Sequence, residues 1–163
     1  MTETRVGIGF DAHRFADGRP LVLGGVRIDH PRGLEGWSDA DAVLHAIADA
    51  VLGAAALGDI GRHFPPSDPA WKDADSRELL EAAVTLARRE GWSVVNVDAT
   101  VLAETPRLAP HVDAMRQAIG DACGIAPDRA SVKASTMEGM GFVGREEGIA
   151  ALAVAMLARE TTG

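Results

Sequence analysis

Residues 38–61 read SDADAVLHAIADAVLGAAALGDIG, and this stretch gives the strongest prediction of local structure in the chain. Its apolar residues recur at helical spacing, Ser38 is a residue type favoured at a helix N-cap, and Gly58 is typical of a helix end. The pattern predicts a helix over about residues 39–57. Turn-forming residues crowd the next segment, 58–69, and a loop of that length often takes part in binding.

Strands and helices alternate in the rest of the chain. Period-two patterns and glycine turns predict strands over residues 5–10, 21–23, 26–28, 92–102 and 130–135. Further helices are predicted over residues 76–89, 106–122 and 149–158, the second with Pro106 at its first position. This order predicts the fold class α/β (α+β) in a single domain over residues 1–163. We expect a sandwich of a mixed β-sheet with helices on one face, plus a small β-ribbon at residues 21–28.

Composition excludes several functional classes. The formal net charge is -8 and the pI about 5.0, with no run of Lys or Arg, so nucleic acid and an anionic membrane surface are poor partners. The most apolar stretch, residues 51–57, is far shorter than the roughly 20 residues of a membrane span. Cys123 is the only cysteine, which excludes an internal disulfide and favours the reducing cytoplasm. The first residues lack the apolar run of a secretory signal.

A candidate metal site combines Asp11, His13 and His45. Asp11 and His13 end a predicted strand, where a spacing of two points both side chains to one face, although a surface Asp and His fit the pattern too. His45 lies one helical turn from Asp41 and from Asp49, an arrangement typical of a metal ligand whose tautomer is fixed by carboxylates. A plain stripe of charges fits this spacing equally. Three ligands would leave one tetrahedral position open, as in catalytic sites.

The glycine-rich run over residues 133–145 contains a literal G-x-G-x-x-G at residues 139–144. Too little chain follows it for the second strand of a dinucleotide fold, so that fold is rejected. The run still offers backbone N–H groups, the hydroxyls of Ser135 and Thr136, and the carboxylate of Glu138. Together these groups could cradle phosphates and hold Mg²⁺, whereas a flexible turn is the alternative interpretation.

Arg107 lies in the first turn of the third predicted helix, where the helix dipole disfavours a cation. An anion could bind there to Arg107 and to the free N–H groups, and an exposed loop Arg fits the position equally. No Ser-His-Asp order and no Cys-His pair stands out, so covalent catalysis is unsupported.

Four stretches together resemble the 2-C-methyl-D-erythritol 2,4-cyclodiphosphate synthase family of the non-mevalonate isoprenoid pathway: GIGFDAHRF, SDADAVLHAIADAVLGAAALGDIG, AETPRLAPH and KASTMEGMGFVGREEG. They occur in order over essentially the whole chain. The resemblance implies a phosphorus-oxygen lyase that cyclises 4-diphosphocytidyl-2-C-methyl-D-erythritol 2-phosphate and releases CMP. It also implies a cytoplasmic homotrimer with active sites between neighbouring subunits.

The same resemblance implies roles for individual residues. Asp11, His13 and His45 would bind Zn²⁺, Glu138 would lie near a Mg²⁺ or Mn²⁺ ion, and Thr136 and residue 37 would assist catalysis. Substrate contacts are implied for Asp11, His13, Trp37, Ser38, Asp59, Ile60, Gly61, Phe64, Asp68, Ala103, Pro106, Arg107, Ser135, Thr136, Met137, Glu138, Phe142 and Arg145. Within this set Asp59 and Gly61 would meet the ribose, and residues 103–107 the cytidine end.

The chain departs from the family pattern at several positions. Trp37 stands where His is usual, and an indole can donate a hydrogen bond to a phosphate but cannot carry charge or shuttle a proton. Trp37 could instead cover the substrate's methyl group. The other departures are Pro66, Met137, Gly139 and Glu146.

Two other functions stay open on the sequence alone. One is a zinc phosphohydrolase that uses a metal-bound hydroxide. The other is an inactive trimeric protein that binds nucleotides or, in a channel lined by Phe142 and Arg145, isoprenoid diphosphates.

Overall fold

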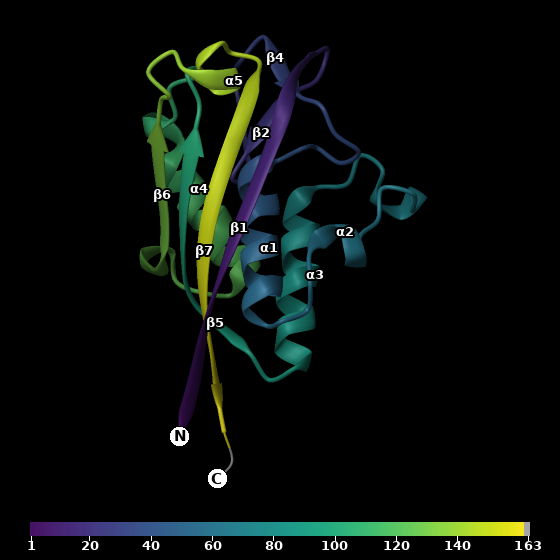
Figure 1. The fold of residues 1–163 in the computed structure, drawn as a ribbon, viewed down its shortest axis with the longest axis vertical. Helices are drawn as coiled ribbons and strands as arrows, with labels where there is room; N and C mark the ends of the chain where they lie inside the picture. Colours follow the sequence, from purple (N-terminus) through teal and green to yellow (C-terminus); the bar gives the residue numbers. More distant parts are fainter. Residues whose placement is uncertain (162–163) are drawn as a thin grey trace.

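The computed structural model describes residues 1–161. Its main sheet contains β1 (Thr2–Asp17), β4 (Arg32–Leu34), β5 (Ser93–Leu102), β6 (Ala130–Ser135) and β7 (Gly148–Glu160). The strand order is β4-β1-β7-β5-β6, and helices cover one face of the sheet (Figure 1). β5 and β6 run parallel while the other neighbours are antiparallel, so the sheet is mixed, as predicted.

A separate ribbon pairs β2 (Leu21–Leu23) with β3 (Val26–Ile28), which confirms the predicted hairpin. The long helices are α1 (Ala42–Ala54), α3 (Ser76–Arg89) and α4 (Val112–Cys123). Short helical turns complete the fold: α2 (Ile60–His63), α5 (Gly141–Gly144), η1 (Pro69–Trp71), η2 (Ala109–His111) and η3 (Pro127–Arg129). Within residues 1–161 no helix combines the length and apolarity needed to cross a membrane.

The predicted helix over residues 149–158 is wrong, because this segment is the central strand β7. Ala153 and Ala155 face the helices and are buried, whereas Leu152 and Val154 point to the opposite face. Both faces of β7 are therefore apolar. A strand with two apolar faces loses the alternation that distinguishes it from a buried helix.

Two predicted helices begin too early. α1 starts at Ala42 with Asp41 as its N-cap, so Ser38 does not cap it, and the helix ends at Ala54. α4 starts at Val112 and not at Pro106. Pro110 lies in the turn η2 just before α4, and because it lacks an N–H donor it cannot make the α-helical bond that would extend the helix back to Pro106.

Asp41 is fully buried and joins α1 to the ribbon. Its carboxylate accepts four backbone N–H bonds of 2.7–3.1 Å, two from Gly24 and Gly25 and two from the first turn of α1. We expect Asp41→Ala to lower the free energy of unfolding by about 3 kcal/mol, because it removes a cap and leaves buried N–H groups unpaired. Urea unfolding would measure the loss.

The control for this prediction is Asp75→Ala, which removes the N-cap of α3 at a more exposed position. That variant should lose only about 1 kcal/mol. Equal losses in the two variants would contradict the role assigned to the ribbon contacts.

Two glycines of β1 bring α1 against the sheet. A Cβ atom at Gly9 would lie 1.8 Å from the Ala46 carbonyl oxygen, and one at Gly7 would lie 2.0 Å from the Ala50 carbonyl oxygen. No larger residue fits between strand and helix at this distance. The close approach brings His45 of α1 beside Asp11 and His13 of β1.

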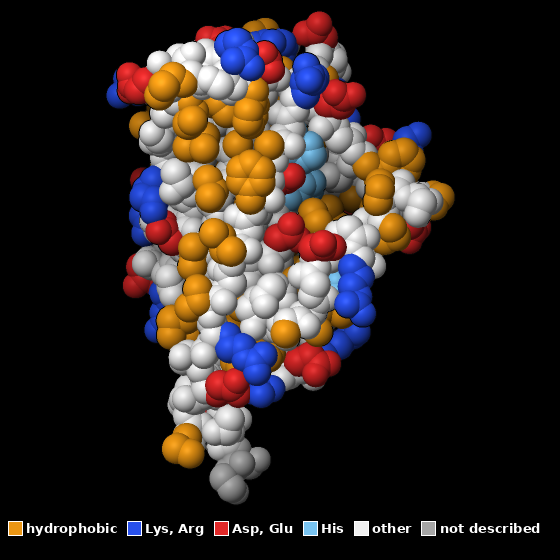
Figure 2. All heavy atoms as spheres, in the orientation of Figure 1, with side chains coloured by type: hydrophobic (Ala, Val, Ile, Leu, Met, Phe, Trp, Pro, Cys, Tyr) orange, Lys and Arg blue, Asp and Glu red, His pale blue; other side chains and the backbone are white. Residues whose placement is uncertain are grey.

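The face of the sheet opposite the helices is strongly apolar. Val6, Ile8 and Phe10 of β1 are 67%, 69% and 56% exposed, and Leu152 and Val154 of β7 lie beside them in register. Figure 2 shows hydrophobic side chains gathered over the strands on this side of the molecule. We call these five residues the apolar sheet face. An exposed patch of this kind marks an interaction surface more often than free surface.

Candidate metal centre and adjoining pocket

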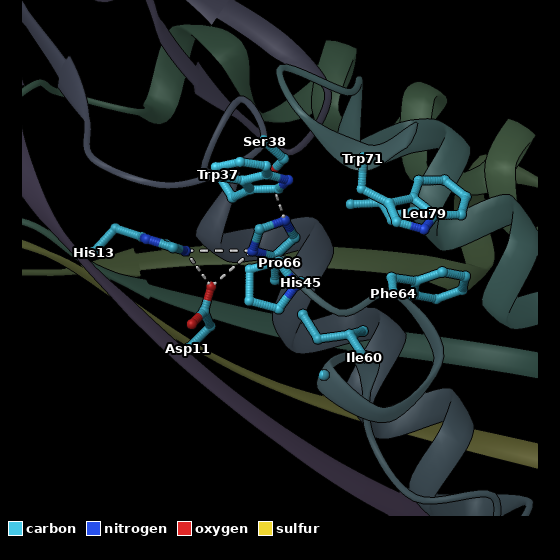
Figure 3. Close-up of a pocket in the computed structure, with 11 residues that line it drawn as sticks. Asp11, His13, Trp37, Ser38, His45, Ile60, Phe64, Pro66, Trp71 and Leu79 are labelled. Carbon is cyan, nitrogen blue, oxygen red and sulfur yellow. Dashed lines mark hydrogen bonds and ion pairs between the residues drawn. The ribbon is translucent and has the colours of Figure 1, made fainter. Parts of the chain in front are cut away.

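Asp11, His13 and His45 converge on one point, as Figure 3 shows. Asp11 and His13 lie two residues apart along β1, so both side chains point to the same side of the sheet, toward α1. The Asp11 Oδ2 atom lies 2.7 Å from His13 Nε2 and 3.0 Å from His45 Nδ1, and the two nitrogens are 3.3 Å apart. The predicted trio is thus brought together in one cluster.

The protonated nitrogen of His13 is fixed by the backbone. His13 Nδ1 lies 2.8 Å from the Glu35 carbonyl oxygen. A carbonyl oxygen only accepts hydrogen bonds, so Nδ1 must carry a proton. In the neutral ring the lone pair is then on Nε2, which faces Asp11.

A residue of α3, Ser76, determines which nitrogen of His45 carries the proton. The Ser76 hydroxyl donates a short hydrogen bond to the Asp39 carboxylate, so Ser76 Oγ accepts from His45 Nε2, 2.9 Å away. Ser38 Oγ lies 3.2 Å from the same nitrogen. His45 Nδ1 therefore presents its lone pair to the cluster.

The expectation that Asp41 and Asp49 orient His45 is wrong. Asp41 binds the ribbon and the first turn of α1, and Asp49 accepts the Ile60 N–H at 2.8 Å, at the start of α2. Ser76 and Asp39 supply the orientation instead. Sequence reasoning missed them because Ser76 follows His45 by 31 residues and reaches it only through the packing of α3 on α1.

The cluster requires a cation. Two imidazole lone pairs and one carboxylate oxygen face one another, and they repel unless a proton or a metal ion lies between them. Burial lowers the pKa of His13, but the hydrogen bond and charge of Asp11 outweigh burial and raise the pKa above its ordinary value of 6.5. Burial raises the pKa of Asp11, but His13 and His45 outweigh it and hold that pKa well below its usual range.

The donor set fits a divalent metal. Donor atoms on one tetrahedral zinc ion at about 2.0–2.1 Å lie roughly 3.3 Å apart, close to the spacing of this cluster. Two imidazoles and one carboxylate are typical zinc ligands, and a three-ligand set leaves a position open for substrate. Asp11, His13 and His45 could therefore hold one metal ion.

Ser76→Ala should lower the zinc affinity of the cluster by about 10- to 100-fold, because His45 Nε2 loses a hydrogen-bond acceptor and the ring its fixed orientation. Competition with a zinc chelator would measure the change. Thr85→Ala removes a hydroxyl from the exposed side of the same helix and should leave the affinity unchanged. An affinity for Ser76→Ala within about twofold of the wild type would contradict this role.

A pocket of about 250 Å³ adjoins the metal cluster. Of the predicted substrate contacts it brings together Trp37, Ser38, Ile60, Gly61 and Phe64, with Pro66 among the other lining residues. Its remaining walls, Trp71 and Leu79, were missed, because Leu79 reads as an ordinary core position of α3 and Trp71 as a loop residue. Phe64 and Trp71 pack edge to face with ring centroids 4.9 Å apart. The walls away from the metal cluster are thus mostly apolar.

Asp59 and Asp68 lie in the loop that borders this pocket. Asp59 caps α2 through the Arg62 N–H at 3.0 Å, and Asp68 caps η1 through the Ala70 N–H at 2.9 Å. Both side chains therefore stabilise the start of a short helical turn.

A second group of predicted residues lies at the other edge of the sheet, beyond β7. The segments after β5 and β6 meet there through the Ala103 N–H and Ser135 carbonyl at 3.0 Å, and through Glu104 Oε1 and the Met137 N–H at 2.8 Å. None of the described pocket-lining residues comes from these segments. The group contains Ala103, Pro106, Arg107, Ser135, Thr136, Met137 and Glu138. On one chain this group therefore lies apart from the metal cluster and its pocket.

Phe142 and Arg145 form a third location. Phe142 lines a small cavity of about 160 Å³ with Arg14 and Glu147, and this cavity also touches His13. Arg145 Nε donates to the Glu147 carboxylate at 2.8 Å. Neither residue lines the pocket beside the metal cluster.

Known proteins resemble this chain over nearly its full length. The YgbB family model matches residues 4–158. The curated 2-C-methyl-D-erythritol 2,4-cyclodiphosphate synthase of Symbiobacterium thermophilum is 61% identical, with 94% of this chain and 98% of the relative covered. The synthase of Salinibacter ruber is 60% identical, with 91% of this chain and 95% of the relative covered.

Solved structures agree with the sequence relatives. The bifunctional IspDF of Campylobacter jejuni superimposes with a TM-score of 0.94 at 41% identity, over 98% of this chain. This chain spans only 43% of that longer protein. A 2C-methyl-D-erythritol-2,4-cyclodiphosphate synthase described as bound to CDP has a TM-score of 0.86 at 35% identity, with 94% of this chain and 99% of that one covered.

Proposed function

The chain belongs to the YgbB family, and from this membership we infer that it catalyses the reaction of its synthase relatives. It converts 4-diphosphocytidyl-2-C-methyl-D-erythritol 2-phosphate to 2-C-methyl-D-erythritol 2,4-cyclodiphosphate and releases CMP, in the non-mevalonate synthesis of isoprenoid precursors. The observation that carries this conclusion is the full-length identity of about 60% together with the convergent Asp11, His13 and His45. The reaction makes the enzyme a lyase.

The chemistry suits a site without a protein nucleophile. An oxygen of the 2-phosphate forms a bond to the β-phosphorus, and the bond from that phosphorus to the oxygen of CMP breaks, so CMP leaves with the electron pair. The protein's task is to fold the substrate so that its two phosphates meet, which converts a difficult encounter into a ring closure. The walls around Phe64 and Trp71 are apolar and offer few hydrogen-bond partners to water, which could otherwise attack the same phosphorus.

We propose that the ion at Asp11, His13 and His45 is Zn²⁺ and that Glu138 holds Mg²⁺ or Mn²⁺ with the substrate diphosphate. Bound divalent cations supply Lewis-acid neutralisation of phosphate charge. The Thr136 hydroxyl lies beside Glu138, with Thr136 Oγ1 3.3 Å from Glu138 Oε1, and the Ser135 hydroxyl donates to the Thr136 carbonyl oxygen. We assign to Thr136 the donation of a hydrogen bond to the phosphate oxygens.

We propose that the active enzyme is a homotrimer in which each site combines two chains. The two halves of the predicted site lie on opposite edges of one sheet, and the apolar sheet face offers a surface for association. A neighbouring subunit would then bring residues 103–107 and 135–138 against the metal cluster. The related structure described as bound to CDP supports a cytidine site, with Asp59 and Gly61 at the ribose and Arg107 at the cytidine end. We place this reaction in the cytoplasm.

Release of CMP from the purified protein tests the proposed function. The reaction is expected to need divalent metal and to give a cyclic product without oxygen from solvent. A zinc phosphohydrolase would instead give a linear product that carries label from ¹⁸O-water. Absence of CMP beyond that of a metal-stripped sample would overturn the proposal and favour a binding protein.

A further inference from the structure

We propose that Trp37 is a positioning residue that holds the segment 64–71 over the substrate pocket before substrate binds. This inference rests on the proposed function of the pocket. The Trp37 indole Nε1–H donates to the Asp68 carbonyl oxygen at 3.3 Å, and Trp37 itself lines the pocket. Its N–H is therefore occupied, which argues against the earlier interpretation that the indole donates to a substrate phosphate.

The backbone of Trp37 is fixed on both sides. Arg19 donates to the carbonyl oxygens of Gly36, at 2.8 Å, and of Ser38. The Trp37 carbonyl accepts the Asp73 N–H at 2.8 Å. The indole therefore projects from a rigid support, although 43% of the residue remains exposed.

The accepting segment is a compact unit that carries one wall of the pocket. The Asp68 carbonyl also accepts the Trp71 N–H at 3.2 Å, and Asp68 Oδ1 accepts the Ala70 N–H at 2.9 Å. Trp71 in turn packs on Phe64, and both rings line the pocket. Because Trp71 is hydrogen-bonded to Asp68 and packs on Phe64, holding the Asp68 carbonyl holds this aromatic wall in place. Figure 3 shows Trp37, Phe64 and Trp71 around the pocket.

This arrangement assigns Trp37 an effect on binding and not on the chemical step. A wall formed in advance interacts equally with substrate and transition state, so its loss raises KM and leaves kcat nearly unchanged. A residue that touched the reacting phosphates would lower kcat instead. The change in KM compared with the change in kcat therefore distinguishes a positioning role of Trp37 from direct contact with the reacting phosphates.

The test uses Trp37→Phe, which keeps an aromatic ring and removes the N–H donor. Hydrogen exchange of the amides in residues 66–74 of the full protein, without substrate, is expected to accelerate about fivefold, the size set by one neutral hydrogen bond. The amides of α1 serve as the internal control and should be unchanged. KM should rise by about the same factor while kcat stays within about twofold. Unchanged exchange in residues 66–74, or a fall in kcat alone, would overturn the proposal.

Two further measurements distinguish failure of this proposal from misfolding of the variant and from failure of the proposed function. If Trp37→Phe does not fold, exchange of the Trp37 indole N–H in the wild-type protein tests the proposal. Slow exchange would support it, and exchange as fast as that of free tryptophan would overturn it. If the wild type releases no CMP, the proposed function fails. The exchange experiment then still decides whether Trp37 holds the segment.

Discussion

His45→Ala is expected to lower the rate of CMP release by at least about a thousandfold. Removal of one of three ligands leaves only Asp11 and His13, which cannot retain the ion against solvent. A catalytic cation supplies several kcal/mol of charge stabilisation in the transition state, and each tenfold in rate corresponds to about 1.4 kcal/mol. The measurement is CMP release with Zn²⁺ and Mg²⁺ present, after circular dichroism has shown that the helix content is retained.

His111→Ala is the matched control, because His111 lies in η2 and lines none of the described pockets. It should keep activity within about twofold of the wild type. Stripping the wild type with a chelator should reproduce the His45→Ala loss, and added metal should restore only the wild type. A folded His45→Ala protein that keeps more than about a tenth of wild-type turnover would show that the cluster is not the catalytic centre.

The sequence predicted those elements whose patterns are local. α3 and β6 were predicted with the boundaries that the structure shows, because one buried face and one exposed face give a clear period. The helix predicted over residues 149–158 was wrong, because these residues form β7 and both faces of that strand are apolar. One of these two faces belongs to the apolar sheet face defined above. The apolar residues that made β7 resemble a buried helix therefore also indicate a surface for a partner.

The metal cluster was predicted more fully than its surroundings. Strand alternation put Asp11 and His13 on one face and helix phase put His45 beside two carboxylates, but both patterns also fitted surface residues, and the resemblance was needed to join strand to helix. The Ser76 contact to His45 and the Trp37 contact to Asp68 both join segments that are distant in sequence. No periodicity signals such contacts, because they are set by how helices and loops pack and not by local spacing.

Ile8→Asp is expected to dissociate the proposed trimer and to lower CMP release by at least about a hundredfold, because a carboxylate would be strongly unfavourable in a desolvated interface. Ile8 is 69% exposed in one chain, so the substitution should leave the fold of that chain intact. Sedimentation would measure the oligomer and circular dichroism the fold. Thr85→Asp adds the same charge on the helical side and should remain trimeric and active. A monomeric Ile8→Asp protein with full activity would show that one chain completes the site.

A mixing experiment tests the shared site directly. His45→Ala and Glu138→Ala chains are each expected to be inactive alone, because each lacks one half of every site. In trimers assembled at random from equal amounts, a site recovers when an intact His45 from one chain meets an intact Glu138 from its neighbour, which gives roughly a quarter of wild-type activity. If both residues serve the same site from the same chain, no mixture recovers. The recovered fraction therefore decides whether the two halves meet across a subunit boundary.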